Sequence, residues 1–183
     1  MSDRSRLETA RLVLRRWTPD DLAPFAAMNA DPEVMRYFPA PLSRTASDAL
    51  AARADAGFEE RGYGLWALSL RSDGSFLGFT GLNPMPPGVP GSDGVEVGWR
   101  LARPYWGHGY ATEAARAAIA DGFEAVGLTR IDSITAVLNE PSQRVMRRLG
   151  MSPAERFEHP RVPEGSPLRP HIRYVLERPD GMD

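Results

Sequence analysis

Hydrophobic positions early in the chain form a strand-like run, followed by two helical stretches. Residues 12–17, Leu-Val-Leu-Arg-Arg-Trp, predict a first strand. Thr18-Pro19-Asp20-Asp21 predicts a helix start, because a capping hydroxyl, a proline in the first turn and acids near the positive helix end all favour one. We expect that helix to run to about Ala30, and a second helix to occupy residues 45–61 and stop before Gly62.

The middle of the chain changes to short aromatic or β-branched runs separated by turns. Residues 63–70 and 75–82 predict a hairpin around the tight turn Ser72-Asp73-Gly74, and residues 94–101 predict a further strand. Residues 83–94 form a long connector rich in proline and glycine. Irregular loops of this length inside a compact domain are often functional or mobile.

The last third of the chain predicts helices alternating with strands. Apolar positions on one face predict a helix over residues 111–126, with Gly127 just beyond its end. Residues 130–138 predict a strand, and Asn139 is the expected N-cap of a helix over residues 140–149.

Two final strands are expected around Phe157 and residues 172–176, flanking a loop at 159–170. The element order becomes β-α-α-β-β-β-α-β-α-β-β, which predicts a mixed sheet covered by helices.

Length and charge fit one soluble domain spanning residues 1–183, and a formal charge of −2 gives no basis for a nucleic-acid surface. No apolar run approaches the roughly 18 residues that a membrane span needs. Residues 1–6 contain no apolar signal region. We therefore expect a cytoplasmic protein without nucleic-acid or membrane partners.

Two residue types are missing from the sequence, and each absence excludes chemistry. Without cysteine there is no disulfide, thiol nucleophile or cysteine zinc site. All 22 cationic residues are arginine, which excludes lysine Schiff bases and the P-loop lysine. His108, His159 and His171 are not at helical i,i+4 spacing, so no metal site is expected.

A glycine-containing turn, residues 106–110, stands between an expected strand and a helix start. Helix N-termini carry unpaired N–H groups and a positive dipole end, and glycine lets an anion approach the backbone, so a pyrophosphate suits this position. A Gly-x-Gly before a helix is also often a plain turn. A dinucleotide motif is disfavoured because Thr112 occupies the third glycine position and the turn follows hairpin strands.

Several ordered motifs make the chain resemble the GNAT family of N-acetyltransferases. Residues 106–111 align with the family's [Gln/Arg]-x-x-Gly-x-[Gly/Ala] motif, with Trp106 in place of Gln or Arg. Residues 9–15 match Thr-x-Arg-Leu-x-Leu-Arg, and residues 107–114 match Gly-x-Gly-Tyr-Ala-Thr-Glu-Ala. Both motifs are typical of the branch of ribosomal-protein N-terminal acetyltransferases, the RimJ/RimL type.

Two further motifs of that branch occur at similar spacing. Residues 96–99 match Glu-x-Gly-Trp/Tyr, and Asn139 with Ser142 begins the late Asn-x-x-Ser … Gly-Phe motif, in which Met151 replaces Phe. The resemblance covers residues 8–176. It implies an α/β (α+β) domain whose mixed, mostly antiparallel sheet has about seven strands flanked by helices.

The resemblance also implies an acetyl-CoA site and no metal. Strand 97–101 would pair its backbone with the pantetheine arm, turn 107–112 would wrap the pyrophosphate, and Asn139 and Ser142 would lie near the thioester. The implied cofactor-binding residues are Val97, Trp99, Arg100, Leu101, Trp106, Gly107, His108, Gly109, Tyr110, Ala111, Thr112, Asn139 and Ser142.

Acetyl transfer needs a neutral amine, a stabilised oxyanion and a leaving thiolate. An α-amine has a pKa of about 8, so a base must accept a proton. Glu96 is the candidate base, directly or through a water, and a backbone N–H near Trp99 is the candidate oxyanion donor. Ser142 is the candidate donor to the leaving sulfur, with Tyr105 and Tyr110 as alternatives.

Each role has a structural alternative. Glu96 could be a solvent-facing strand residue, Ser142 a helix-capping residue, and His108 a turn residue that contributes only backbone. The whole chain could be a catalytically inactive acyl-CoA-binding module, or a nucleotide-binding protein that uses the same turn. The amine acceptor, a protein N-terminus or a small molecule, and the choice between monomer and homodimer stay open.

Overall fold

The computed structural model describes residues 6–179 and residue 181. The expectation for residues 1–6 falls largely outside that description. The helices are α1 (Leu22–Ala30), α2 (Arg44–Arg61), α3 (Tyr110–Glu124) and α4 (Glu140–Arg148), with 3-10 turns η1 (Pro19–Asp21) and η2 (Arg103–Tyr105). None of the helices in the described part of the chain has the length and apolar character that a bilayer span requires.

One sheet runs through the whole molecule in the order β1-β2-β3-β4-β5-β6-β8-β7. Only β5 and β6 are parallel, so the sheet is mixed and mostly antiparallel, as expected. The strands are β1 (Arg6–Glu8), β2 (Leu12–Arg15), β3 (Leu65–Leu70), β4 (Phe76–Pro84), β5 (Val95–Leu101), β6 (Arg130–Ala136), β7 (Ser152–Glu158) and β8 (Pro170–Glu177).

The sheet has eight strands rather than about seven. The additional strand is β1, which pairs antiparallel with β2 through Leu7 and Leu14. Its three residues are too few to show a period of two, and it exists because β2 offers an edge to pair with.

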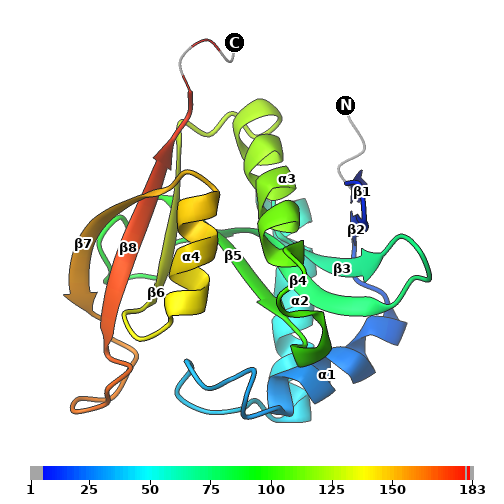
Figure 1. Ribbon diagram of the computed structural model, residues 1–183, viewed down its shortest axis with the longest axis horizontal. Helices are drawn as coiled ribbons and strands as arrows, with labels where there is room; N and C mark the ends of the chain where they lie inside the picture. The colour runs from blue at the N-terminus through cyan, green and yellow to red at the C-terminus, as the bar shows by residue number, and fades with distance from the viewer. Residues whose placement is uncertain (1–5, 180, 182–183) are drawn as a thin grey trace.

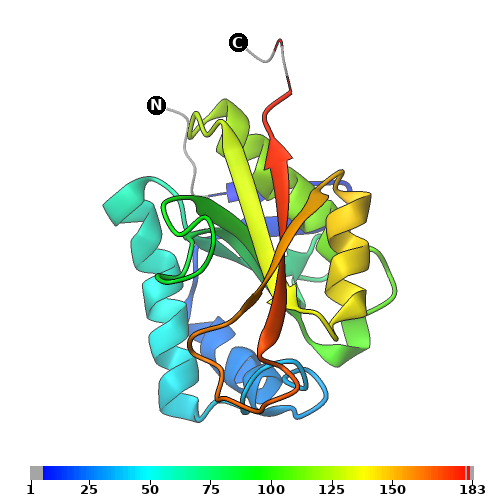
Figure 2. The same cartoon turned by 90° about the vertical axis from the view of Figure 1, so that its left-hand side faces the viewer.

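Helices cover both faces of the sheet, α3 and α4 on one face and α1 and α2 on the other (Figures 1 and 2). The larger core lies beneath α3, where Ala115 and Ala118 pack with Leu12, Val97 and Ile131. A second core lies under α1 and α2 and contains Phe25 and Phe79, among others. The central strands are therefore buried on both sides, which fixes the positions of the loops at their ends.

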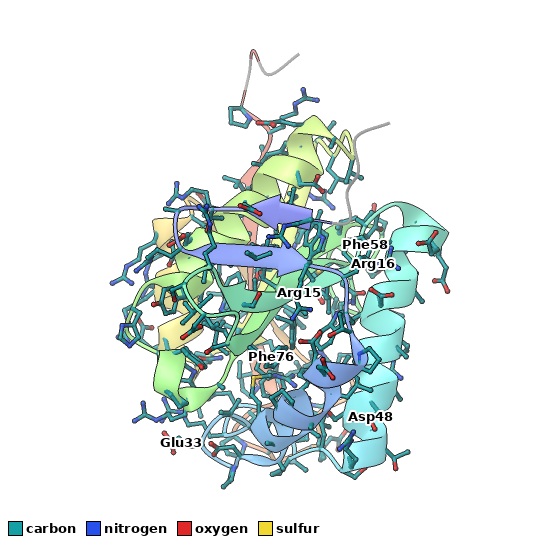
Figure 3. The ribbon with its side chains drawn as sticks, turned by 90° about the vertical axis from the view of Figure 1, so that its right-hand side faces the viewer. Arg15, Arg16, Glu33, Asp48, Phe58 and Phe76 are labelled. Carbon is teal, nitrogen blue, oxygen red and sulfur yellow. The ribbon has the colours of Figure 1, made fainter. Side chains whose placement is uncertain are left out.

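The first strand is shorter than predicted, since β2 ends at Arg15 instead of Trp17. Arg15 and Arg16 turn to acidic partners, Asp21 at 2.7 Å and Asp55 of α2 at 2.6 Å. Figure 3 shows Arg16 beside Phe58 on α2, and the guanidinium lies 5.0 Å from that ring. These contacts pull the chain away from β3 and tie the start of α1 to α2.

The predicted helix start at residues 18–21 forms the 3-10 turn η1, and the α-helix itself begins at Leu22. The other boundaries that the sequence predicted agree to within two residues. Helix α3 ends at Glu124, two residues early, because the N–H groups of Val126 and Leu128 bond back to the carbonyls of Asp121 and Gly122. The connector after β4 is packed: Met85 and Val89 are buried, and Met85 N donates to Gly94 O at 3.0 Å.

Helix α2 approaches β3 so closely at Gly64 that a Cβ there would lie 2.5 Å from the Ala54 carbonyl oxygen. We expect Gly64→Ala to destabilise the protein by about 1–3 kcal/mol through overpacking. Urea unfolding measures this. Gly98→Ala is the matched control, because a Cβ at Gly98 meets nothing within 4 Å. Equal stability of the two variants would contradict the close approach.

Candidate functional site

Strands β5 and β6 share a single residue pair, Glu96 with Asp132. One further link follows, in which Ser133 Oγ donates to Val97 O at 3.0 Å. Beyond it the two strands diverge, as Figure 1 shows toward its lower edge. The backbone groups of Trp99 and Leu101 therefore face a gap in the sheet, whereas those of Gly98 and Arg100 face β4.

A cavity of about 460 Å³ lies at this gap. It brings together most of the residues that the sequence predicted. The predicted residues that line it are Trp99, Arg100, Leu101, Trp106, Gly107, Gly109, Tyr110, Ala111, Thr112, Asn139 and Ser142. Glu96, Val97 and His108 are not in its wall.

The glycine turn before α3 has the open backbone that its sequence suggested. Gly107 and Gly109 have φ of 81° and 80°, a left-handed conformation that other residues adopt only with strain. Both are exposed, and the first N–H groups of α3 have no intrahelical partner. Trp106 Nε1 donates to Leu101 O at 2.7 Å, which fastens the turn to the end of β5.

A contact between two motifs holds the turn from the other side. Glu113 in the first turn of α3 accepts hydrogen bonds from Thr9 Oγ1 at 2.6 Å and from the Arg11 backbone N–H at 2.9 Å. Its carboxylate also pairs with the Arg11 guanidinium at 2.6 Å, and Arg11 Nη1 donates to His108 O at 2.9 Å. His108 thus contributes its carbonyl to this clamp, which we define as Thr9, Arg11 and Glu113.

The start of α4 forms another wall. Asn139 Oδ1 accepts from Ser142 N at 3.2 Å, the expected N-cap, while Asn139 Nδ2 donates to Thr135 Oγ1 at 3.0 Å. The buried Asn139 side chain is therefore engaged in holding the end of β6 to α4. Since α3 also begins at the cavity, the positive ends of two helices meet there.

Glu96 lies on the face of β5 opposite to α3, next to Asn83 of β4 and Asp132 of β6. Burial raises its pKa to about 8, and the neighbouring Asp132 carboxylate acts in the same direction, while Asn83 and Arg161 oppose it. Asp132 itself is fully buried and accepts from Arg130 Nε and Arg173 Nε. A carboxyl group with a pKa near 8 can take up a proton at neutral to mildly alkaline pH.

Arg100 has a side chain and a backbone with different surroundings. Its backbone pairs with Phe79 of β4, and its guanidinium donates from Nη1 to Asn29 Oδ1 of α1 at 2.6 Å. The same group lies 4.2 Å from the centre of the Phe38 ring. Burial lowers the pKa of Arg100 to about 10.

The connector between α1 and α2 supplies cavity residues that sequence reasoning did not find. Arg36 and Tyr37 line the cavity together with Phe38, and Arg144 and Arg148 of α4 line another side. Residues 31–43 carry no periodic pattern, so nothing in the sequence predicted that Arg36 and Tyr37 line the cavity. The clamp residues, by contrast, could have been found from the sequence, since they belong to the two motifs 9–15 and 107–114 of the same branch.

Comparisons with known proteins agree with this architecture. The family described as "Acetyltransferase (GNAT) domain" matches residues 11–152. YkkB of Bacillus subtilis is 32% identical over 157 residues, covering 82% of this chain and 87% of that protein. FsC-acetyl coenzyme A-N(2)-transacetylase of Aspergillus fumigatus is 28% identical over 189 residues, covering 96% of this chain and 77% of that protein.

Solved structures share the fold. An acetyltransferase of Agrobacterium tumefaciens has a TM-score of 0.78 at 26% identity, with 94% of each chain covered. RimL, a ribosomal L7/L12 alpha-N-protein acetyltransferase solved with coenzyme A, has a TM-score of 0.75 at 14% identity, with 92% of this chain and 95% of that chain covered. An α/β acyltransferase architecture and a matching family domain lead to one conclusion: the chain belongs to the GNAT acetyltransferase family. It is an acetyl-CoA-dependent N-acetyltransferase.

The clamp predicts a remote effect on cofactor affinity. Glu113→Ala removes the acceptor for Thr9 and Arg11, so the turn at His108 loses its anchor. We expect the dissociation constant of CoA to rise about tenfold, or about 1.4 kcal/mol. Isothermal calorimetry measures it. Glu8→Ala, which removes a surface partner of Arg6, is the control and should bind CoA normally. Unchanged affinity in a folded Glu113→Ala variant would argue against the clamp.

Proposed function

We propose that the protein transfers the acetyl group in a ternary complex, by direct attack of a primary amine on acetyl-CoA, with Glu96 as the base. The observation that carries this proposal is the gap between β5 and β6. The gap opens into a cavity that the N-termini of α3 and α4 line. At its other end, where β5 and β6 pair, lies Glu96, a carboxyl group of raised pKa.

In this proposal the cofactor occupies the α3 and α4 side of the gap. Its diphosphate lies on the turn 107–112, where N–H groups at the start of α3 are unpaired and glycines keep side chains out of the way. Its pantetheine arm pairs with the backbone of residues 97–101 in place of the missing strand. The supporting fit is the cavity itself, which runs along this stretch of β5 to Ser142.

The chemistry follows from the groups around the gap. Glu96 removes a proton from the ammonium group, directly or through a water, and the neutral amine attacks the thioester carbonyl. A backbone N–H near Trp99 stabilises the oxyanion, and Ser142 donates toward the leaving sulfur. A thiol has a pKa of about 8.5, so its thiolate needs little assistance to leave.

The acceptor is a primary amine. The names of two similar proteins suggest different kinds of amine. RimL is named as acting on a ribosomal protein, and the Aspergillus relative is named as an N(2)-transacetylase. The proposal assigns this chain to the RimJ/RimL-like branch on its four motifs. It treats residues 1–183 as one cytoplasmic domain, with the core at 8–176, acting as a monomer or homodimer.

Thiol release distinguishes this function from an inactive acyl-CoA-binding module. The purified protein is incubated with acetyl-CoA and a panel of amines, and CoA release is followed with a thiol reagent. Amine-dependent release supports transfer. Tight binding of acetyl-CoA without release for any amine would establish the inactive module instead. Competition by ATP or NAD stronger than that by CoA would point to a nucleotide-binding protein.

Glu96→Gln tests the base. We expect kcat to fall by about 10²- to 10⁴-fold, the usual contribution of a general base, while acetyl-CoA affinity stays the same. Steady-state kinetics and calorimetry measure the two quantities. Full activity of the variant would remove Glu96 from this role.

The pH profile gives an independent test of the same residue. Because only the carboxylate form accepts a proton, kcat/KM of the wild type should rise with pH through about 8, the raised pKa of Glu96. Deprotonation of the amine also makes kcat/KM rise with pH, so two acceptors with different amine pKa values are compared. A rise at the same pH for both acceptors that is missing in Glu96→Gln belongs to Glu96. If the pH of every rise changes with the amine, the assignment to Glu96 is wrong.

A further inference from the structure

Strand β5 presents two different faces on either side of the sheet. Val97 and Leu101 pack into the core beneath α3, with Trp99 partly buried against it. Because side chains alternate along a strand, Glu96, Gly98 and Arg100 share the opposite face. Their contacts agree, since Glu96 and Arg100 lie beside Asn83 and Phe79 of β4, and Arg100 reaches Asn29 of α1.

Between the carboxyl group and the guanidinium, the strand surface is open. A Cβ built on Gly98 would meet nothing within 4 Å. The backbone of Gly98 does not have the left-handed conformation that demands glycine. What glycine provides here is space, with Glu96 on one side and Arg100 on the other.

The guanidinium of Arg100 has unused hydrogen-bonding capacity. It donates to the neutral amide of Asn29, and among residues 6–179 and 181 no carboxylate forms an ion pair with it. Arg100 Nε is buried and has no hydrogen-bond partner in the described part of the chain. A buried cation without an anion is costly, so an anion that binds there gains a strong, charge-assisted partner. Arg100 also lines the cavity, which gives such an anion access.

We propose that the acceptor is a small amino acid, whose amine lies over Gly98 toward Glu96 and whose carboxylate binds Arg100. This inference rests on the proposed function and deepens it, because it names the chemical class of the acceptor. The arrangement is complementary to an amino acid, with a carboxyl group facing the amine and a guanidinium facing the carboxylate.

Geometry limits the size of this acceptor. Glu96 and Arg100 are four residues apart in β5, which is about 13 Å between their Cα atoms along an extended strand. This distance lets one small molecule place its amine near Glu96 and its carboxylate near Arg100. The exposed ring of Phe38, stacked on the guanidinium, forms the outer wall.

Arg100 could instead serve only as a structural brace. It bonds to Asn29, whose amide Nδ2 in turn donates to Ser47 Oγ at 2.8 Å, so the chain of contacts links β5 to α1 and α2. A brace affects all acceptors equally, whereas a carboxylate site affects only acceptors with a carboxylate. Comparing two acceptors within the same variant therefore separates the two roles.

The experiment compares amino acids with their amides, which keep the amine and lose the carboxylate charge. Wild type, Arg100→Gln and Arg53→Gln are assayed for CoA release with α-, β- and γ-amino acids and their amides at one fixed pH below the pKa of Arg100, which is about 10. The acid-to-amide ratio of kcat/KM is compared between the variants, so that the difference in amine pKa between acid and amide cancels. Arg53 lies exposed on α2, away from the cavity, and is the matched control. We expect wild type and Arg53→Gln to prefer the acid in kcat/KM by about ten- to a hundredfold, and Arg100→Gln to lose that preference.

A second variant and a binding measurement cover the other outcomes. Gly98→Val should raise the acceptor KM by a larger factor than the dissociation constant of CoA, since its side chain fills the open space on the acceptor face. In calorimetry, an N-acetylamino acid should bind the CoA-loaded wild type and not Arg100→Gln. If transfer occurs but acid and amide react alike, or Arg100→Gln keeps the preference, the inference is overturned and the proposed function stands. If no amine releases CoA, the proposed function fails, and binding of the N-acetylamino acid decides whether Arg100 holds a carboxylate. Binding to the wild type but not to Arg100→Gln supports the carboxylate site, and no binding to the wild type overturns it.

Discussion

The architecture of the site depends on how little β5 and β6 pair. They are parallel neighbours joined at Glu96 and Asp132, and the separation beyond this point leaves backbone groups of β5 available. Unpaired backbone groups inside a protein must find partners, so a gap in a sheet is a binding surface by nature. The starts of α3 and α4 add more unpaired N–H groups at the same place. The proposed cofactor site is the place where these unfilled hydrogen-bonding requirements meet.

The residue pair that ends the contact between the strands also sets the chemistry of Glu96. Asp132 is buried, and Arg130 and Arg173 each donate to one of its oxygens. Its negative charge and the burial of Glu96 act together to raise the pKa of Glu96 to about 8. The two arginines therefore do more than hold β6 to β8. They keep a second carboxylate beside the candidate base, which a neutral side chain at 132 would not provide.

The sequence predicted the elements that local interactions determine, and it missed those that depend on distant parts of the chain. The caps at Ser43 and Asn139 and the positive-φ glycines at 107 and 109 are local signals, and the elements they delimit were predicted correctly. Strand β1 exists only through its partner, and Arg11 meets Glu113 across about half the chain, so no local pattern specified either. The cavity-lining connector 31–43 is placed by packing alone. The family resemblance supplied the cofactor-binding residues, but not the direction of their side chains.

Arg100 illustrates that last point and explains why β5 can serve two ligands. The resemblance implied a role for Arg100 toward the cofactor, but its backbone pairs with Phe79 of β4, and the backbone groups at the gap belong to its neighbours Trp99 and Leu101. Its side chain points to the other face, where it shares an open strip with Glu96 and Gly98. A strand with its edge unpaired offers three surfaces, the edge and two faces, and here one face is filled by the core beneath α3. The edge and the remaining face meet at Gly98, so a thioester on the edge and an amine on the face would approach each other at the one residue without a side chain.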